Sequence, residues 1–289
     1  MQPAAEKESA DDHDSTGDVA GRRWHLRGLL PGRRPGPGPG RSRRTRRASW
    51  PGGRGEDRRL RHAGLRGAPC LGQREYPIVL VISEVFGVHE YIRDSTRRFA
   101  KAGYYAIAPE LFKREGGVAQ LTNIQDILKI VLAQPRPQTL GDLKAAVDWA
   151  KTRPGVRADS VGVTGWCWGG STTIQVAATN PDMKAAVAWY GPPARPYQGP
   201  SGAVTGFDVA KDIKIPFLFL LGSTDTNPRW PTGASSPKWS SRGTATWKSS
   251  STTAPGHGFH ADYRPSYNPV AAADAWKRCI DWFNQYLKG

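Results

Sequence analysis

One hexapeptide, Gly165-Trp166-Cys167-Trp168-Gly169-Gly170, constrains the fold of this chain more than any other feature. A nucleophile flanked by glycines in this way sits in a strained turn between a strand and a helix, where side chains at the glycine positions would clash. The context fits, because residues 161–164 have the apolar pattern of a strand and residues 171–178 can form a helix. The hexapeptide therefore predicts a nucleophile elbow that presents Cys167. The alternative is a buried structural cysteine packed between two tryptophans.

From residue 76 onward, strand-like and helix-like segments alternate. Apolar, β-branched runs typical of buried parallel strands occupy residues 77–83, 104–108, 161–164, 185–190 and 215–221. Apolar residues at helical spacing occupy residues 88–102, 124–132, 140–150 and 276–287. This alternation predicts a mostly parallel sheet with helices on both of its faces. Together with the elbow, it predicts an α/β-hydrolase domain over residues 75–289 that acts through a thiol.

A thiol hydrolase needs a base and an acid that orients the base, and in this fold the acid precedes the histidine in the chain. Asp225 directly follows the apolar run at 215–221, and His257 lies in a loop ahead of the last helix. The sequence leaves two other bases open, namely His260 and, near Glu84, His89. A turn-forming role for Asp225 and a solvated surface position for the histidines also fit.

The net charge of +16 is concentrated near the N-terminus. Residues 1–74 contain 17 Lys and Arg against 8 Asp and Glu, and residues 21–74 are rich in Gly and Pro without helical or strand periodicity. Such composition predicts a disordered or non-native basic segment over 1–74. Three explanations compete: a tail that contacts nucleic acid or acidic lipid, a twin-arginine export signal at Arg22-Arg23, or translation of GC-rich DNA in the wrong frame. We favour the last, so we do not expect nucleic acid as a partner.

The cysteines and the hydropathy exclude several other classes of protein. Three cysteines lie far apart without a CxxC pair, which argues against a structural zinc site or a disulfide framework and favours a reduced compartment. No run of 18 or more apolar residues is present, so we expect no membrane-spanning helix. We therefore expect a cytoplasmic monomer.

Residues 228–254 do not fit the rest of the predicted domain. They contain no Val, Ile, Leu, Met, Phe, Tyr or Cys, although the fold needs a helix and then a buried strand here. We expect neither from this composition, and without that strand its neighbour's backbone would be unpaired and His257 poorly held. The hypothesis is a reading-frame change that later reverts, because 32 positions still separate Asp225 from His257.

Five motifs together resemble those of the dienelactone hydrolase family. They are Glu84-Val85-Phe86-Gly87-Val88-His89-Glu90, Ala108-Pro109-Glu110-Leu111, the hexapeptide around Cys167, Ala188-Trp189-Tyr190-Gly191-Pro192, and His257-Gly258-Phe259-His260-Ala261-Asp262-Tyr263-Arg264-Pro265. The resemblance covers about residues 76–227 and 254–288, with 32 positions between Asp225 and His257, close to the family's spacing. It implies a carboxymethylenebutenolidase-like activity, the opening of a dienelactone ring to give maleylacetate, with no metal or organic cofactor.

The resemblance also implies a role for each site residue. Cys167 corresponds to the nucleophile, and Asp225 and His257 to the acid and base. Glu84 corresponds to a carboxylate that partners the resting cysteine and helps to form the thiolate. The backbone N–H groups of Val85 and Trp168 would form the oxyanion hole.

Two further residues are candidates for binding the substrate. Arg264 could hold an anionic substrate, although it lies seven residues past His257, farther than in the best-studied branch of the family. Tyr190, in the Ala188–Pro192 motif, is the second candidate.

A thiolate suits activated esters such as enol lactones, whose leaving group departs as a stabilised enolate. The expected partner is therefore a small lactone or ester. The alternatives are a general carboxylesterase or thioesterase of the same fold, or an inactive homologue with a basic tail.

Overall fold

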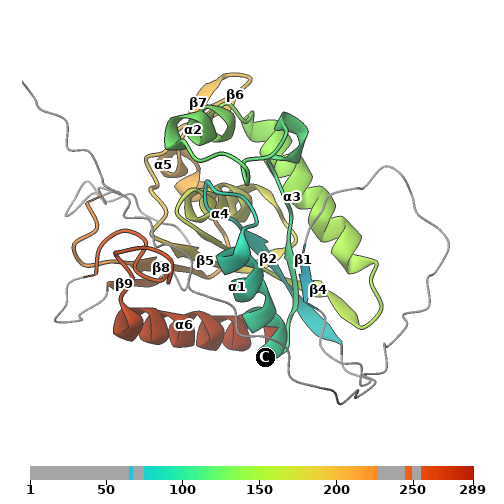
Figure 1. Cartoon of the computed structure of the whole chain (residues 1–289). Coiled ribbons are helices and arrows are strands. Elements are labelled where there is room, and N and C mark those ends of the chain that lie inside the picture. The colour runs from blue at the N-terminus through green and yellow to red at the C-terminus, as the bar shows by residue number, and fades with distance from the viewer. Residues whose placement is uncertain (1–64, 68–74, 227–244, 249–254) are drawn as a thin grey trace, which may run out of the picture. The chain divides into compact units, whose positions relative to one another are not determined.

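A sheet of strand order β1-β3-β2-β4-β5-β8-β9 forms the centre of the described chain (Figure 1). The computed structural model describes residues 65–67, 75–226, 245–248 and 255–289. These residues fall within one unit, Asp57–Gly289. The expectation of disorder over 1–74 and of an anomalous segment at 228–254 lies mostly outside the described residues.

The sheet is parallel except at one edge, which confirms the predicted fold class. Its parallel strands are β2 (Tyr76–Ile82), β3 (Tyr105–Ala108), β4 (Val156–Trp166), β5 (Met183–Trp189), β8 (Phe217–Leu221) and β9 (Ala245–Lys248). The antiparallel edge strand is β1 (Leu65–Gly67), which pairs with β3. A separate hairpin joins β6 (Tyr197–Gly199) and β7 (Gly202–Val204).

The described helices are α1 (Glu90–Lys101), α2 (Ile124–Leu132), α3 (Arg136–Lys151), α4 (Trp168–Thr179), α5 (Gly206–Val209) and α6 (Pro269–Phe283). Short 3-10 turns occur at η1 (Lys113–Glu115) and η2 (Ala210–Asp212), and a π-helical turn, η4 (Asn284–Lys288), follows α6. None of the helices among the described residues is both long enough and apolar enough to cross a membrane.

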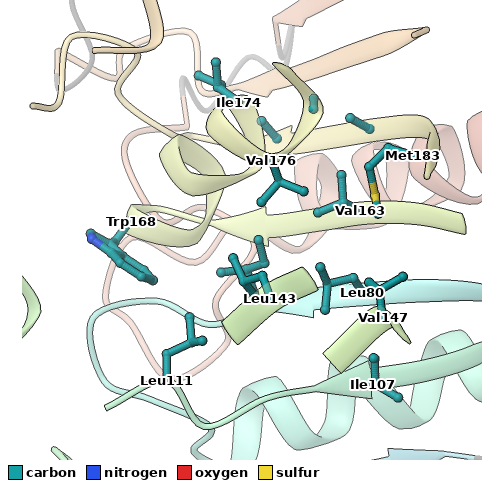
Figure 2. Close-up of a cluster of buried hydrophobic side chains, with 14 of the residues drawn as sticks. Leu80, Ile107, Leu111, Leu143, Val147, Val163, Trp168, Ile174, Val176 and Met183 are labelled. Carbon is teal, nitrogen blue, oxygen red and sulfur yellow. The ribbon is translucent and has the colours of Figure 1, made fainter. Parts of the chain in front are cut away.

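Successive side chains along a strand point to opposite faces of the sheet. The core is therefore divided into two clusters, one on each face. Leu80 of β2 belongs to the cluster that contains the buried side chains of α2, α3 and α4. Its neighbours Val79 and Val81 belong to the cluster that contains those of α1 and α6. Figure 2 shows part of the first cluster, in which Leu80 and Val163 lie beside Leu143 and Val147 of α3. Strands β2, β3, β5 and β8 thus contribute side chains to both clusters, which explains their continuous apolar sequences.

Two strands lie where the sequence predicted no regular structure. β1 falls inside 1–74, and β9 falls inside 228–254 and pairs in parallel with β8, from Leu218 opposite Ala245 to Leu221 opposite Lys248. The expectation that 228–254 supplies no strand is therefore wrong. Pairing uses backbone groups that every non-proline residue has, and β9 lies at the end of the sheet order, so it needs only one partner strand.

Candidate active site

Cys167 lies in a strained turn between β4 and α4. Its backbone has φ 55° and ψ −113°, a left-handed region that non-glycine residues rarely adopt. A Cβ on Gly165 would stand 2.4 Å from the carbonyl oxygen of Gly169, and a Cβ on Gly169 would stand 2.4 Å from that of Ile82. The two glycines are therefore required for the turn to pack on β2, as the elbow sequence predicted.

His257 faces Cys167 and is oriented by Asp225. The Nδ1 atom of His257 lies 3.0 Å from Oδ2 of Asp225, whose side chain is only 2% exposed. Burial opposes protonation of the imidazole, but the hydrogen bond to Asp225 and the adjacent thiol of Cys167 raise the pKa of His257 to about 10. An imidazolium at neutral pH is the form that stabilises a neighbouring thiolate.

The loop that carries His257 is held by the end of β8 and by its own hydrogen bonds. The N–H of Thr224 donates to the carbonyl oxygen of Pro255, at 3.1 Å, and the N–H of Asn268 donates to that of Phe259, at 2.9 Å. Phe259 and Ala261 are both buried. The expectation that His257 would be poorly held is therefore not met within the described residues.

His260, the alternative base, is a core residue. It is 3% exposed, and its ring centroid lies 4.4 Å from that of Trp189. Its Nδ1 atom lies 2.5 Å from the hydroxyl of Tyr91. Burial lowers the pKa of His260 to about 3, so this imidazole is neutral and packs among aromatic rings.

Glu84 is fully buried two residues after the end of β2, and three side chains converge on its carboxylate. The Tyr263 hydroxyl donates to Oε2 at 2.5 Å and the Arg264 Nη2 atom donates to Oε1 at 3.3 Å. The Nε2 atom of His89 lies 3.7 Å from Oε2. Burial alone would raise the pKa of Glu84, but His89, Arg264 and Tyr263 together lower it, so the carboxylate is ionised. The contacts described for this carboxylate are thus with these three residues, and its expected partnership with the resting Cys167 stays a prediction.

Arg264 and Tyr190 both lie at the site, as candidates for binding the substrate. The Arg264 side chain is 24% exposed, and its guanidinium carbon lies 5.3 Å from the ring centroid of Phe86. Burial opposes its charge, but Glu84, Tyr263 and the thiol of Cys167 raise the pKa of Arg264.

Tyr190 is fully buried beside the base. Its ring meets that of His257 edge-to-face, with the centroids 5.1 Å apart. Its backbone has φ 37°, which places a second strained residue next to Cys167. Burial and, after it, the nearby Tyr91 and Glu84 raise the pKa of Tyr190, so its hydroxyl keeps its proton.

The two amides expected to form the oxyanion hole follow neighbouring strands. Ile82 of β2 pairs with Gly165 of β4, so Val85 and Trp168 leave the sheet at the same edge. Trp168 is the first residue of α4, and the first N–H groups of a helix have no partner inside it. This placement leaves the Trp168 amide available to an anion at the elbow.

Sequence reasoning missed Tyr263, which contributes the shortest of the three contacts to Glu84. The available signal was its position immediately before Arg264 in a loop that also carries His257. Among the described residues, no group of three or more His, Cys, Asp or Glu side chains could hold a metal ion.

Comparison with known proteins decides the family. The sequence profile of the dienelactone hydrolase family matches residues 67–287. The chain belongs to the dienelactone hydrolase family. The matched range includes residues 228–254.

Three proteins that are similar to this chain come from bacteria. A "Putative carboxymethylenebutenolidase" of Methylorubrum extorquens is 45% identical over 215 residues, which is 73% of this chain and 72% of that protein. One of Escherichia coli K12 is 41% identical over 215 residues, 73% of this chain and 77% of that protein. The crystal structure of a "Putative Dienelactone Hydrolase" from Klebsiella pneumoniae is 37% identical, with a TM-score of 0.65, and covers 76% of this chain and 91% of that one.

Proposed function

We propose that this member of the dienelactone hydrolase family opens the ring of an enol lactone, in a reaction of the dienelactone-to-maleylacetate type, with Cys167 as the nucleophile. The observation that carries the proposal is the alignment of Asp225, His257 and the thiol of Cys167 at the end of the parallel sheet. A carboxylate that orients an imidazole beside a nucleophile at a strained elbow is the arrangement of an acyl-transfer enzyme.

The proposed reaction starts from the thiolate of Cys167 and the imidazolium of His257. The thiolate attacks the lactone carbonyl, and the amides of Val85 and Trp168 stabilise the oxyanion that forms. The ring carbon–oxygen bond breaks, and the proton of His257 goes to the departing enolate. Neutral His257 then takes a proton from water, which attacks the thioester, releases the second carboxyl group and restores the thiolate.

The carboxylate of a dienelactone needs a cation, and Arg264 is the candidate that fits. It lies in the same loop as His257, and both Glu84 and Cys167 raise the pKa of its guanidinium. An incoming carboxylate would compete with Glu84 for the guanidinium. Selectivity for anionic lactones would then depend on how far Arg264 exchanges its ion pair with Glu84 for an ion pair with the substrate.

A general carboxylesterase or thioesterase is the second candidate, and one observation favours it. Arg264 already has an internal counter-ion in Glu84, 3.3 Å away, so the site does not need an anionic substrate to be electrically balanced. A neutral activated ester would meet the same thiolate without displacing this ion pair.

Turnover of a dienelactone and of a neutral p-nitrophenyl ester tests both candidates. If the protein is a lactone hydrolase, kcat/KM should be higher for the anionic lactone than for the neutral ester. Arg264→Gln should then lower kcat/KM for the lactone selectively. If the protein is a general esterase, the neutral ester should be the better substrate. Arg264→Gln should then change kcat/KM for both substrates alike. No turnover of either substrate, in a sample whose fold is intact, would contradict both.

A further inference from the structure

We propose that Glu110 is a positioning residue for the oxyanion hole, because its carboxylate holds the turn that presents the backbone N–H of Val85. This inference rests on the function proposed above, in which that N–H stabilises the oxyanion. A donor of this kind is effective only if it is held in place before the reaction, since a displacement of about 1 Å at a reacting group can cost about a hundredfold in rate. The residues that hold Val85 in place are therefore part of the catalytic design.

Val85 lies in a tight turn that follows β2. The N–H of Gly87 donates to the carbonyl oxygen of Glu84, at 3.3 Å, which closes a four-residue turn with Val85 and Phe86 at its centre. Gly87 has φ 70°, a left-handed conformation that glycine adopts at little cost. The hydrogen bond of the turn uses the N–H of Gly87 and not that of Val85. The direction of the Val85 N–H is therefore set by the position of the turn as a whole.

The elbow holds the entry to this turn. A Cβ on Gly169 would stand 2.4 Å from the carbonyl oxygen of Ile82 and 2.5 Å from that of Ser83. The backbone of α4 thus packs directly on the chain just before Glu84, next to the nucleophile. These contacts are made ahead of the turn, so they fix where the turn begins and leave its exit to be held by another group.

Glu110 holds the exit of the turn. It follows β3 by two residues, and β3 pairs in parallel with β2, so both strands end at the same edge of the sheet. The N–H of Val88 donates to Oε2 of Glu110, at 2.8 Å. A Cβ on Gly87 would stand 2.8 Å from Oε1 and 3.0 Å from Oε2, so the carboxylate packs directly against this glycine. One side chain thus contacts both the last residue of the turn and the residue after it.

A role in capping α1 does not explain these contacts. The N–H groups that a helix leaves unpaired are those of its first residues, and α1 begins at Glu90 with His89 as its N-cap. Glu110 instead accepts from Val88, ahead of the N-cap residue. Its Oε1 atom is buried and has no hydrogen-bond partner among the described residues. A buried acceptor without a partner costs free energy, so this carboxylate contributes less to the stability of the fold than a fully paired one would.

Two reactions of the same thiol separate the positioning of the oxyanion hole from a general effect on the site. In acylation by p-nitrophenyl acetate, the thiolate of Cys167 adds to the carbonyl carbon, the carbonyl electron pair moves to the oxygen, and p-nitrophenolate then leaves. In alkylation by iodoacetamide, the thiolate displaces iodide in one step, and no oxyanion forms. A change in the thiolate or in its access alters both rates, whereas a displaced Val85 N–H alters acylation alone.

Glu110→Ala removes the acceptor for the Val88 N–H. We expect the rate of acylation, measured from the release of p-nitrophenolate, to fall at least about tenfold. The rate of alkylation should stay within about twofold of wild type, because the thiolate and its imidazolium partner are unchanged. Glu110→Gln keeps an oxygen for the Val88 N–H, and Oε1 has no hydrogen bond to lose among the described residues. Glu110→Gln should therefore recover most of the acylation rate.

Two further variants complete the comparison. Glu110→Leu fills most of the same space without an acceptor, so it should behave like Glu110→Ala, and it decides the outcome if Glu110→Ala does not fold. Glu90→Ala is the matched control, because it removes an exposed carboxylate two residues after Val88 that contacts Arg97 instead of the turn. Glu90→Ala should change neither rate.

The pattern of the two rates decides the proposal. Acylation at the wild-type rate in Glu110→Ala or Glu110→Leu would overturn it, as would a loss of alkylation as large as the loss of acylation. Acylation of Glu110→Gln as slow as that of Glu110→Ala would also overturn it. Each of these outcomes concerns Glu110 alone, because wild-type Cys167 is acylated in all of them.

The wild-type protein separates this inference from the proposed function. Cys167 of folded wild-type protein may react with iodoacetamide and yet be acylated by neither p-nitrophenyl acetate nor a dienelactone. In that case the proposed function fails, and the inference on Glu110 fails with it.

Discussion

Gly222 packs so closely on the carbonyl oxygen of Pro255 that a Cβ on this glycine would stand 2.4 Å from it, and 2.6 Å from the carbonyl oxygen of Gly256. The loop after β8, which carries Asp225, is thereby joined to the loop that carries His257. The acid and the base are aligned by this direct contact between their loops. This contact is made by residues that lie outside the segment 228–254.

Gly222→Ala should lower activity more than stability. The added methyl group pushes the two loops apart, and a displacement of about 1 Å at a reacting group can cost about a hundredfold in rate. We expect kcat/KM to fall at least about tenfold, and the free energy of unfolding to fall by about 1–3 kcal/mol. Steady-state kinetics and urea unfolding measure the two effects.

Gly141→Ala is the matched control for that substitution. Gly141 lies within α3, and a Cβ there would meet nothing within 4 Å. The variant should gain about 0.5–1 kcal/mol of stability from the lower entropy of its unfolded chain and keep its activity. If both glycine variants lose activity equally, the contact between the two loops is not what aligns the pair.

Cys167→Gly should be more stable than Cys167→Ala. The φ of 55° at this position costs free energy for any residue with a Cβ, and glycine adopts it readily. We expect a difference of about 1 kcal/mol in the free energy of unfolding, with neither variant active. Equal stabilities would show that the elbow is not strained in solution.

The pairing of His257 should make stability depend on pH in one direction. The pKa of this residue is raised in the folded protein from its ordinary value of 6.5 to about 10. The contribution of this pairing to stability is therefore complete below about pH 6.5. It is lost as the pH rises through the pKa that His257 has in the folded protein. The difference in the free energy of unfolding between wild type and His257→Gln should shrink from pH 6.5 to pH 10. A difference that grows over this range would contradict the assignment.

Much of the fold could be predicted from residues 76–221, because buried parallel strands have continuous apolar sequences and amphipathic helices have a clear period. The elbow was predictable because Gly165 and Gly169 are sterically required. β1 and β9 could not be predicted, since short edge strands are specified by backbone pairing with β3 and β8 and carry little signal in their side chains.

The site was only partly accessible to sequence reasoning. Asp225 and His257 could be placed by chain order, and the structure brings them within 3.0 Å of each other. The partners of Glu84 could not, because Tyr263 and Arg264 are 179 and 180 positions away and reach it through the tertiary fold. The sequence favoured His257 and left His260 open as an alternative base, and the burial of His260 beside Trp189 makes it a core residue.

Removing the charge of Arg264 should destabilise the fold through Glu84. Arg264→Gln leaves a fully buried carboxylate without its cation, and breaking a buried pair from one side costs about 3–5 kcal/mol. Because Arg264 is partly exposed and Tyr263 still donates to Glu84, we expect about 2 kcal/mol. The Glu84→Gln/Arg264→Gln double variant should recover part of that loss. Additive losses in a double-mutant cycle would show that the two residues are not coupled.

The most direct test of the central claim combines turnover with mass spectrometry of the intact protein. A dienelactone and a p-nitrophenyl ester are incubated with wild type and with Cys167→Ala, and the reaction is quenched in acid. We predict hydrolysis by wild type, an acyl adduct that peptide mapping assigns to Cys167, and a rate lower by about a thousandfold or more in Cys167→Ala. Hydrolysis at an unchanged rate in Cys167→Ala, or no hydrolysis and no adduct in folded wild-type protein, would contradict the claim.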